Sequence, residues 1–250
     1  MRQIVIDVGN TSTSVGCWEG GVVSCVTAIE GGIARDPAAC ERALRDAGAA
    51  DATAAILASV VPAVNDTWVG MLRRSFGIEL QILTHETPMP VGIDYPDKKQ
   101  IGADRLADAA GAFMRHGAPV IVADFGTALT FDIVNAKGDY TGGVIAPGIP
   151  LMTSYLHEKT AKLPLVDLRG DFPEWGDSTV NAMKLGARIG YRGMVREIAN
   201  FIRGKVGTSA PLVATGGYAK WALEGSGIEC HIEPDLTLFG LGAILNHVKQ

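Results

Sequence analysis

The sequence is poor in the features that mark several common classes of protein. Aromatic residues make up 6% of its 250 residues and charged residues 20%, with a formal net charge of −5. No run of lysine and arginine occurs, so the chain lacks the basic stripe that neutralises nucleic-acid phosphates. We therefore expect no nucleic-acid partner.

Cysteine and long apolar runs are equally scarce. No pair of cysteines has the CxxC spacing, and no histidine–cysteine cluster has the spacing of a zinc site. We expect the cysteines to be small buried residues in a reducing compartment. No apolar run approaches the about 20 residues of a membrane-spanning helix, and no signal peptide is recognisable. The sequence thus predicts a cytoplasmic protein without a membrane partner. The four cysteines are Cys17, Cys25, Cys40 and Cys230.

Glycine and aliphatic residues are, in contrast, abundant. Hydrophobic residues make up 47% of the chain, which is typical of a globular protein. A chain of 250 residues is long enough for two compact domains. The 31 glycines indicate many tight turns and close backbone approaches. Both the ends of helices and strands in an α/β fold and the phosphate loops of nucleotide-binding proteins require such glycines.

The first 116 residues predict a mixed sheet with helices on its faces, because a meander of strands is followed by alternating helix and strand. Asp36 and Pro37 together are typical of a helix start, and the stretch 87–100 has the Pro, Gly and Asp content of a loop. The expected strands are 3–7, 13–18, 21–27, 54–60 and 79–83, and the expected helices are 36–48, 62–76 and 102–116.

The remaining residues repeat this plan. Strands are expected at 119–124, 128–134, 139–146, 211–214 and 228–232, and helices at 148–158, 177–203, after Thr215-Gly216-Gly217, and at 236–248. An internal repeat weighs more than local features in deciding the fold. We therefore predict an α/β protein with two domains of similar plan, at residues 1–116 and 117–250.

One motif occurs at the end of the first strand of each half. A glycine there lets the backbone bend, and successive N–H groups after it can form a concavity that binds anions. The aspartate would repel a phosphate directly, so its expected role is to act through Mg²⁺. Each copy alone also fits a polar β-turn. The two copies are Asp7-Val8-Gly9-Asn10-Thr11 and Asp124-Phe125-Gly126-Thr127-Ala128.

Two further motifs lie at predicted helix starts. Thr215-Gly216-Gly217 would allow close approach of an anionic or flat ligand, or could simply begin a helix. Asp104, within Gly102-Ala103-Asp104-Arg105, is placed to accept the proton of an attacking hydroxyl group. Arg105 can bind a carboxylate through two hydrogen bonds. The same pair is also typical of a structural helix start with a salt bridge.

Taken together, these motifs resemble the acetate and sugar kinase/actin superfamily and, more narrowly, type III pantothenate kinases. The resemblance covers essentially the whole chain. Besides the two aspartate motifs and the Asp104 motif, it includes Ser59-Val60-Val61-Pro62, Gly142-Gly143-Val144-Ile145-Ala146-Pro147-Gly148, Thr160-Ala161-Lys162-Leu163-Pro164 and Leu236-Thr237-Leu238-Phe239-Gly240-Leu241.

The resemblance implies two actin-like (ribonuclease H-like) domains, each a mixed sheet flanked by helices, with a nucleotide cleft between them. It implies transfer of the γ-phosphoryl group of ATP to pantothenate, the first step of coenzyme A synthesis, by a homodimer that uses Mg²⁺. Asp104 would be the catalytic base, and Asp124 would bind K⁺ or NH₄⁺. Substrate contacts would come from Tyr95, Gly102, Ala103, Arg105 and Thr179, and ATP contacts from Asp7, Val8, Gly9, Asn10, Thr11, Ser12, Thr13, Ser14 and Thr127.

Two other functions fit parts of the same pattern. One alternative is another small-molecule kinase of the superfamily, although sugar kinases are usually longer and carry inserts that this chain lacks. A non-catalytic ATP-binding regulator is the second alternative. The presence of Asp104 and Arg105 argues against loss of catalysis, and the absence of a basic face argues against direct contact with DNA.

Overall fold

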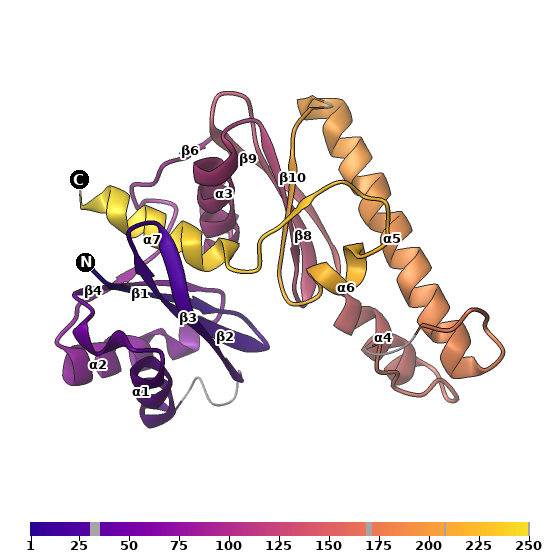
Figure 1. The fold of residues 1–250 in the computed structure, drawn as a ribbon, viewed down its shortest axis with the longest axis horizontal. Coiled ribbons are helices and arrows are strands. Elements are labelled where there is room, and N and C mark those ends of the chain that lie inside the picture. Colours follow the sequence, from indigo (N-terminus) through magenta and orange to yellow (C-terminus); the bar gives the residue numbers. More distant parts are fainter. Residues whose placement is uncertain (31–35, 169–171, 208, 250) are drawn as a thin grey trace. The chain divides into compact units, whose positions relative to one another are not determined.

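The computed structural model describes residues 1–30, 36–168, 172–207 and 209–249 (Figure 1). Contacts between residues divide the chain into two compact units. Unit 1 comprises Met1–Val120, Asp132–Gly142 and Asp235–Gln250, and unit 2 comprises Ile121–Phe131 and Gly143–Pro234. The predicted domain boundary between residues 116 and 117 stays a prediction. By contacts, the C-terminal segment groups with the N-terminal part of the chain.

Five strands of unit 1 form a mixed sheet in the order β3-β2-β1-β4-β5. β1 runs antiparallel to β2 and parallel to β4, and β4 runs parallel to β5. The middle residues of the central strands β1 and β4 are aliphatic without alternation, because both faces of the sheet are covered. The strands are β1 (Gln3–Val8), β2 (Ser12–Glu19), β3 (Val22–Glu30), β4 (Ala54–Ser59) and β5 (Leu80–Ile82).

One face of this sheet is covered by α1 (Pro37–Asp46) and α2 (Asn65–Phe76), which lie side by side (Figure 1). The Asp36 carboxylate accepts a hydrogen bond from Ala38 N at 3.0 Å, which confirms the predicted N-cap. Short 3₁₀ turns, η2 (Ala49–Asp51) and η3 (Pro62–Val64), precede β4 and α2.

The opposite face carries α3 (Ala103–His116) and α7 (Leu236–Val248). These two helices pack closely, since a Cβ on Gly240 would overlap the carbonyl group of Ala107. Asp108 of α3 is buried and accepts a hydrogen bond from Thr237 Oγ1 at 2.7 Å. The last helix of the chain is therefore a part of unit 1.

The second sheet has the order β11-β10-β7-β8-β9-β6. Without β6, the order β9-β8-β7-β10-β11 repeats that of the first sheet strand for strand, which confirms the internal repeat. Its strands are β6 (Gly92–Ile93), β7 (Val120–Phe125), β8 (Ala128–Val134), β9 (Asp139–Pro147), β10 (Leu212–Thr215) and β11 (His231–Ile232).

Unit 2 contains α4 (Ile149–Lys159), α5 (Thr179–Val206) and the short α6 (Ala219–Leu223). Four residues of α5 recur at helical spacing and are buried, so one stripe of this 28-residue helix packs against the rest of unit 2. They are Tyr191, Val195, Ala199 and Ile202. No helix in the part of the chain that the structure describes is long and apolar enough to cross a bilayer.

Two expectations are wrong. The stretch 87–100 is more than a loop, because it contains β6 and the 3₁₀ turn η4 (Lys98–Gln100). β6 pairs with β9 through backbone groups, and a partner so distant in sequence leaves no local signal. Cys25 is exposed rather than buried, since it lies on the edge strand β3, whereas Cys17 and Cys40 are buried as expected.

Candidate active site

The carboxyl ends of β1, β4 and β5 meet at one edge of the first sheet, where ligands of open α/β sheets usually bind. Val8 at the end of β1 is in register with Ser59 at the end of β4. Val60 N donates a hydrogen bond to the Val8 carbonyl oxygen at 3.1 Å. The loop that follows β1 is therefore joined directly to the segment that follows β4.

This first loop is a tight turn closed by a 3.0 Å hydrogen bond from Gly9 N to the Ser12 carbonyl oxygen. The side chains of the turn itself, Asn10, Thr11 and Ser12, are exposed. Two other residues predicted to bind ATP, Val8 and Thr13, have buried side chains, so they could offer a ligand only backbone groups. Asp7 and Ser14 are partly buried and are paired with each other across β1 and β2.

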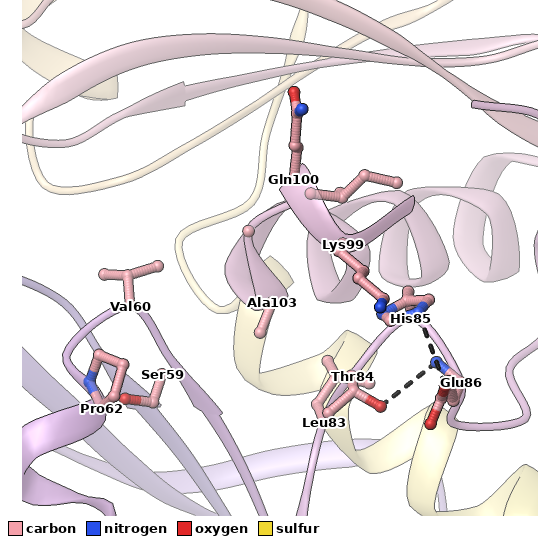
Figure 2. A pocket seen from close by; sticks show the side chains of 12 residues that line it. Ser59, Val60, Pro62, Leu83, Thr84, His85, Glu86, Lys99, Gln100 and Ala103 are labelled. Atoms are coloured by element: carbon pink, nitrogen blue, oxygen red, sulfur yellow. Dashed lines mark hydrogen bonds and ion pairs between the residues drawn. The ribbon is translucent and has the colours of Figure 1, made fainter. Parts of the chain in front are cut away.

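A pocket of about 420 Å³ lies at this edge (Figure 2). Figure 2 shows the segments around it: the end of β4 with the start of η3, the segment after β5, the turn η4, and the start of α3. The pocket thus extends from Val60, which is bonded to the base of the first loop, to the N-terminus of α3. Its lining consists of Ser59, Val60, Pro62, Leu83, Thr84, His85, Glu86, Lys99, Gln100, Ile101, Gly102 and Ala103.

Asp104 follows the last pocket residue and lies in the first turn of α3. Burial raises the pKa of Asp104, while the Arg105 backbone N–H, which donates to Oδ1 at 2.8 Å, and the Arg105 charge oppose that shift. The partial positive charge at the helix N-terminus favours an anion there. Asp104 therefore combines a partly buried carboxylate, whose pKa is raised, with a place directly after the pocket residues Gly102 and Ala103, which suits a proton acceptor.

The side chain of Arg105 lies in a buried cluster. Its Nε donates to Asp132 Oδ1 at 2.8 Å, and the side chains of Arg105 and Asp132 are 12% and 0% exposed. Tyr140 OH donates to the same oxygen at 2.9 Å. Burial raises the pKa of Asp132 to about 6, although Arg105 and the Tyr140 hydroxyl oppose this. The Tyr140 ring lies 5.8 Å from the Arg105 guanidinium and 6.1 Å from the Tyr95 ring.

Gly142 explains why Tyr95 can occupy this place. Its φ of +111° lies in the region that favours glycine, and a Cβ there would come within 2.9 Å of Tyr95 Cε2. Gly142, the first residue of the motif at 142–148, thus leaves room for the Tyr95 ring in the cluster around Arg105.

The second aspartate motif lies in unit 2, at the end of β7. Asp124 is in register with Thr215 of β10, so the Thr215-Gly216-Gly217 segment starts beside it. The loop after Asp124 is closed by a hydrogen bond from Gly126 N to the Ala128 carbonyl oxygen at 3.1 Å. Gly148 N donates to the Thr127 carbonyl oxygen at 3.1 Å, and a Cβ on Gly148 would overlap that carbonyl group.

The groups near Asp124 fit a hard cation, which prefers oxygen ligands. The hydroxyl of Tyr191 is buried and has no hydrogen-bond partner among the residues that the structure describes. Burial and the charge of Asp124 both raise the pKa of Tyr191. No cluster of three or more His, Cys, Asp or Glu side chains suited to a metal occurs within the described ranges.

The structure thus brings together Gly102, Ala103, Asp104, Arg105 and Tyr95 within unit 1. Thr179, the other residue predicted to contact the substrate, is the exposed first residue of α5 in unit 2, and its role stays a prediction.

Comparison with known proteins now decides the family. A family model described as type III pantothenate kinase matches residues 3–200. The chain belongs to this family. A type III pantothenate kinase of Akkermansia muciniphila is 46% identical over 190 residues, which cover 75% of this chain and 76% of that protein. One of Methylacidiphilum infernorum is 37% identical and covers 97% of this chain and 87% of the relative. The resemblance based on the motifs is confirmed.

Solved structures agree on the fold. A protein of Campylobacter jejuni assigned to the Baf family of transcriptional activators superposes with a TM-score of 0.60 at 14% identity, covering 97% of both chains. A ROK family glucokinase of Streptomyces griseus, solved with glucose and AMPPNP, gives a TM-score of 0.53 at 13% identity, covering 98% of this chain and 99% of that one. At these identities the likeness concerns the fold alone. The predicted α/β fold with two actin-like mixed sheets is confirmed for this type III pantothenate kinase family member.

Sequence reasoning missed Asp132, Tyr140 and the pocket segment 83–86. Asp132 left one usable signal, a carboxylate inside the otherwise apolar strand β8, where a buried charge requires a partner. Tyr140 and the segment after β5 left none, because only the folded chain brings them to the site.

Proposed function

We propose that this protein transfers the γ-phosphoryl group of ATP to the primary hydroxyl group of pantothenate, giving ADP and 4′-phosphopantothenate, the first step of coenzyme A synthesis. Family membership supports the reaction class. One structural observation carries the assignment: a single pocket reaches from Val60, bonded to the base of the first loop, to Ala103, the neighbour of Asp104.

The proposed reaction is a direct in-line displacement. The pantothenate oxygen forms a bond to the γ-phosphorus as the bond from that phosphorus to the bridging oxygen of ADP breaks. Asp104 accepts the proton of the hydroxyl group, for which the pKa raised by burial is favourable. Arg105 holds the pantothenate carboxylate, and Tyr95, Gly102, Ala103 and Thr179 complete the substrate contacts.

The ATP phosphates would be held by backbone N–H groups and hydroxyl groups of the turn after Asp7, with Thr127 contributing from the second loop. Residues 8–14 supply these groups, and the exposed Asn10, Thr11 and Ser12 are the side chains best placed to do so. Bound Mg²⁺ would balance the charge of the phosphates. Asp7 directly precedes the turn, and its carboxylate would act on the phosphates through this Mg²⁺.

Asp124 is the proposed ligand for a monovalent cation, K⁺ or NH₄⁺. The carboxylate at the end of β7 and the buried Tyr191 hydroxyl, whose pKa responds to the charge of Asp124, support this role. Such an ion supplies positive charge near the phosphate groups when bound.

The decisive experiment is a coupled assay of ADP release with Mg-ATP and pantothenate, with and without KCl. We expect ADP release that depends on pantothenate, a product whose mass equals that of phosphopantothenate, and no turnover of glucose or N-acetylglucosamine. Tight ATP binding without any turnover of pantothenate would refute the proposal and favour a regulatory protein. Faster turnover of a sugar would favour another kinase of the superfamily.

We also propose that the protein is a homodimer that associates through α4 and α5, which pack against each other within unit 2. These helices expose large apolar side chains, as interfaces between subunits do. Sedimentation should give a dimer, and introducing glutamate at Tyr155 and Ile189 should give a monomer, whereas glutamate at the exposed Val22 of β3 should not. A monomeric wild-type protein would refute this proposal. The large apolar side chains that α4 and α5 expose are Leu151, Tyr155, Leu156, Val180, Ile189 and Phe201.

A further inference from the structure

We infer that Asp132 is a positioning residue for substrate binding: it fixes Arg105 directly, and Tyr95 by way of Tyr140, in the orientation proposed to bind pantothenate. This inference rests on the proposed function. It adds a residue that lies 27 positions from Arg105 in sequence and in none of the motifs that point to the kinase family.

The first step of the argument is burial. The Asp132 side chain is completely inaccessible and that of Arg105 is 12% exposed. A buried guanidinium without a counter-charge is costly, so Arg105 could not occupy this place without a carboxylate beside it. The bond from Arg105 Nε to Asp132 Oδ1, at 2.8 Å, links the first turn of α3 to the middle of β8.

The second step is geometry. Asp132 bonds Nε, and the Tyr140 ring lies 5.8 Å from the guanidinium, so the plane and the direction of the Arg105 fork are both restrained. An arginine side chain otherwise has about 2 kcal/mol of rotamer entropy to lose when it becomes ordered. Because folding already orders Arg105, binding of the substrate does not bear that cost, which is the basis of pre-organisation.

The third step extends the cluster to Tyr95. Asp132 Oδ1 also accepts the hydrogen bond of Tyr140 OH at 2.9 Å, which fixes the Tyr140 ring. The Tyr95 ring packs against that ring, with centroids 6.1 Å apart and planes inclined by 54°. One carboxylate therefore orients both side chains that are proposed to contact pantothenate.

The alternative is a purely structural ion pair between α3 and β8. The two roles make different predictions, because a structural pair affects stability and both substrates alike, whereas a positioning residue affects pantothenate alone. The matched control is Asp108→Asn. Asp108 is also a buried carboxylate of unit 1; it lies about one helical turn after Asp104 on α3, accepts a hydrogen bond from Thr237 and is not among the pocket-lining residues.

The test is a comparison of steady-state constants for Asp132→Asn, Tyr140→Phe and Asp108→Asn with those of the wild-type protein. We expect Asp132→Asn to raise KM for pantothenate roughly 10- to 100-fold, as loss of a charge-assisted hydrogen bond does, and to leave KM for ATP within about twofold. Tyr140→Phe should raise KM for pantothenate by about 2- to 10-fold. Asp108→Asn should lower Tm without changing either KM.

A double-mutant cycle checks that Asp132 acts through Arg105. In an Arg105→Gln background, Asp132→Asn should add little to the rise in KM for pantothenate, since the group that it orients is gone. Full additivity would overturn the inference.

The outcomes separate this inference from the proposed function. A wild-type protein that does not phosphorylate pantothenate overturns both. An active wild-type protein whose Asp132→Asn variant keeps its KM for pantothenate, or raises both KM values equally, overturns only the inference. If Asp132→Asn does not fold, as judged by loss of a cooperative melting transition, an unchanged KM for pantothenate in Tyr140→Phe overturns it instead.

Discussion

Replacing Asp104 by asparagine is the sharpest test of the proposed chemistry. Asparagine keeps the shape of the side chain but cannot accept the proton of the attacking hydroxyl group. Removal of a general base typically slows a reaction by about 10²- to 10⁴-fold, which corresponds to roughly 3–5 kcal/mol of activation free energy. We expect kcat of Asp104→Asn to fall by that factor, while the affinity for ATP stays unchanged.

The structure also predicts that this variant keeps its stability. Burial raises the pKa of Asp104 above its value in the unfolded chain, so the folded protein binds a proton there more tightly than the unfolded chain does. The ionised carboxylate therefore lowers the free energy of unfolding at pH values above both pKa values. Asparagine carries no charge to desolvate. The Tm of Asp104→Asn at neutral pH should equal or exceed that of the wild-type protein.

The assay follows ADP release that depends on pantothenate, with ATP affinity from calorimetry and Tm from circular dichroism. Asp66→Asn is a matched control, because Asp66 also lies in the first turn of a helix, α2, but is exposed. It should cost about 0.3–1 kcal/mol of stability through the helix dipole and leave turnover unchanged.

One result would refute the reasoning. If Asp104→Asn folds normally and its kcat stays within about threefold of the wild-type value, Asp104 does not accept the proton, because a base of this kind contributes far more. A loss of turnover accompanied by a large fall in Tm would mean that the carboxylate has a structural role instead.

Four further outcomes are expected. In the wild-type protein, kcat/KM should fall as the pH drops through the raised pKa of Asp104, so the loss should begin at a higher pH than an ordinary carboxylate would cause; a flat acidic limb contradicts this. Asp124→Asn should abolish both the stimulation by KCl and any rise in Tm that KCl causes, and an unchanged response would reject Asp124 as a ligand. Gly142→Ala should raise KM for pantothenate but not for ATP, because its Cβ would displace a tyrosine ring 2.9 Å away; equal effects on both would argue against this. Gly240→Ala should destabilise the fold by about 1–3 kcal/mol or more through overpacking of α3 and α7, measured by urea unfolding, whereas Gly186→Ala, with open space around its Cβ, should not.

Most helices and strands could be predicted because their signals are local. β1 and β4 are short aliphatic runs bounded by polar residues, and both were expected within two residues of their observed ends. The start of α1 carries an aspartate cap followed by proline, and α3 begins directly after a glycine. Hydrophobic periodicity and capping chemistry act over a few residues, so they are legible without a structure.

The elements that were missed have partners distant in sequence. β6 has two residues and exists because its backbone pairs with β9, more than 40 residues later. The exposure of Cys25 likewise depends on β3 being an edge strand, which follows from the order of the sheet rather than from the residue. Neither fact is contained in a local pattern.

The amino-acid sequence alone supplied the short motifs, and their resemblance to type III pantothenate kinases indicated the reaction that this protein is proposed to perform. A glycine turn after an aspartate and a carboxylate at a helix start are chemical patterns of neighbouring residues, and the repeat of one motif indicated the repeat of the fold. The tertiary structure decided which groups support them. Only folding brings Asp132 into hydrogen-bonding contact with Arg105, and Val60 and Ala103 to one pocket, because such contacts depend on burial and on strand order across the whole chain.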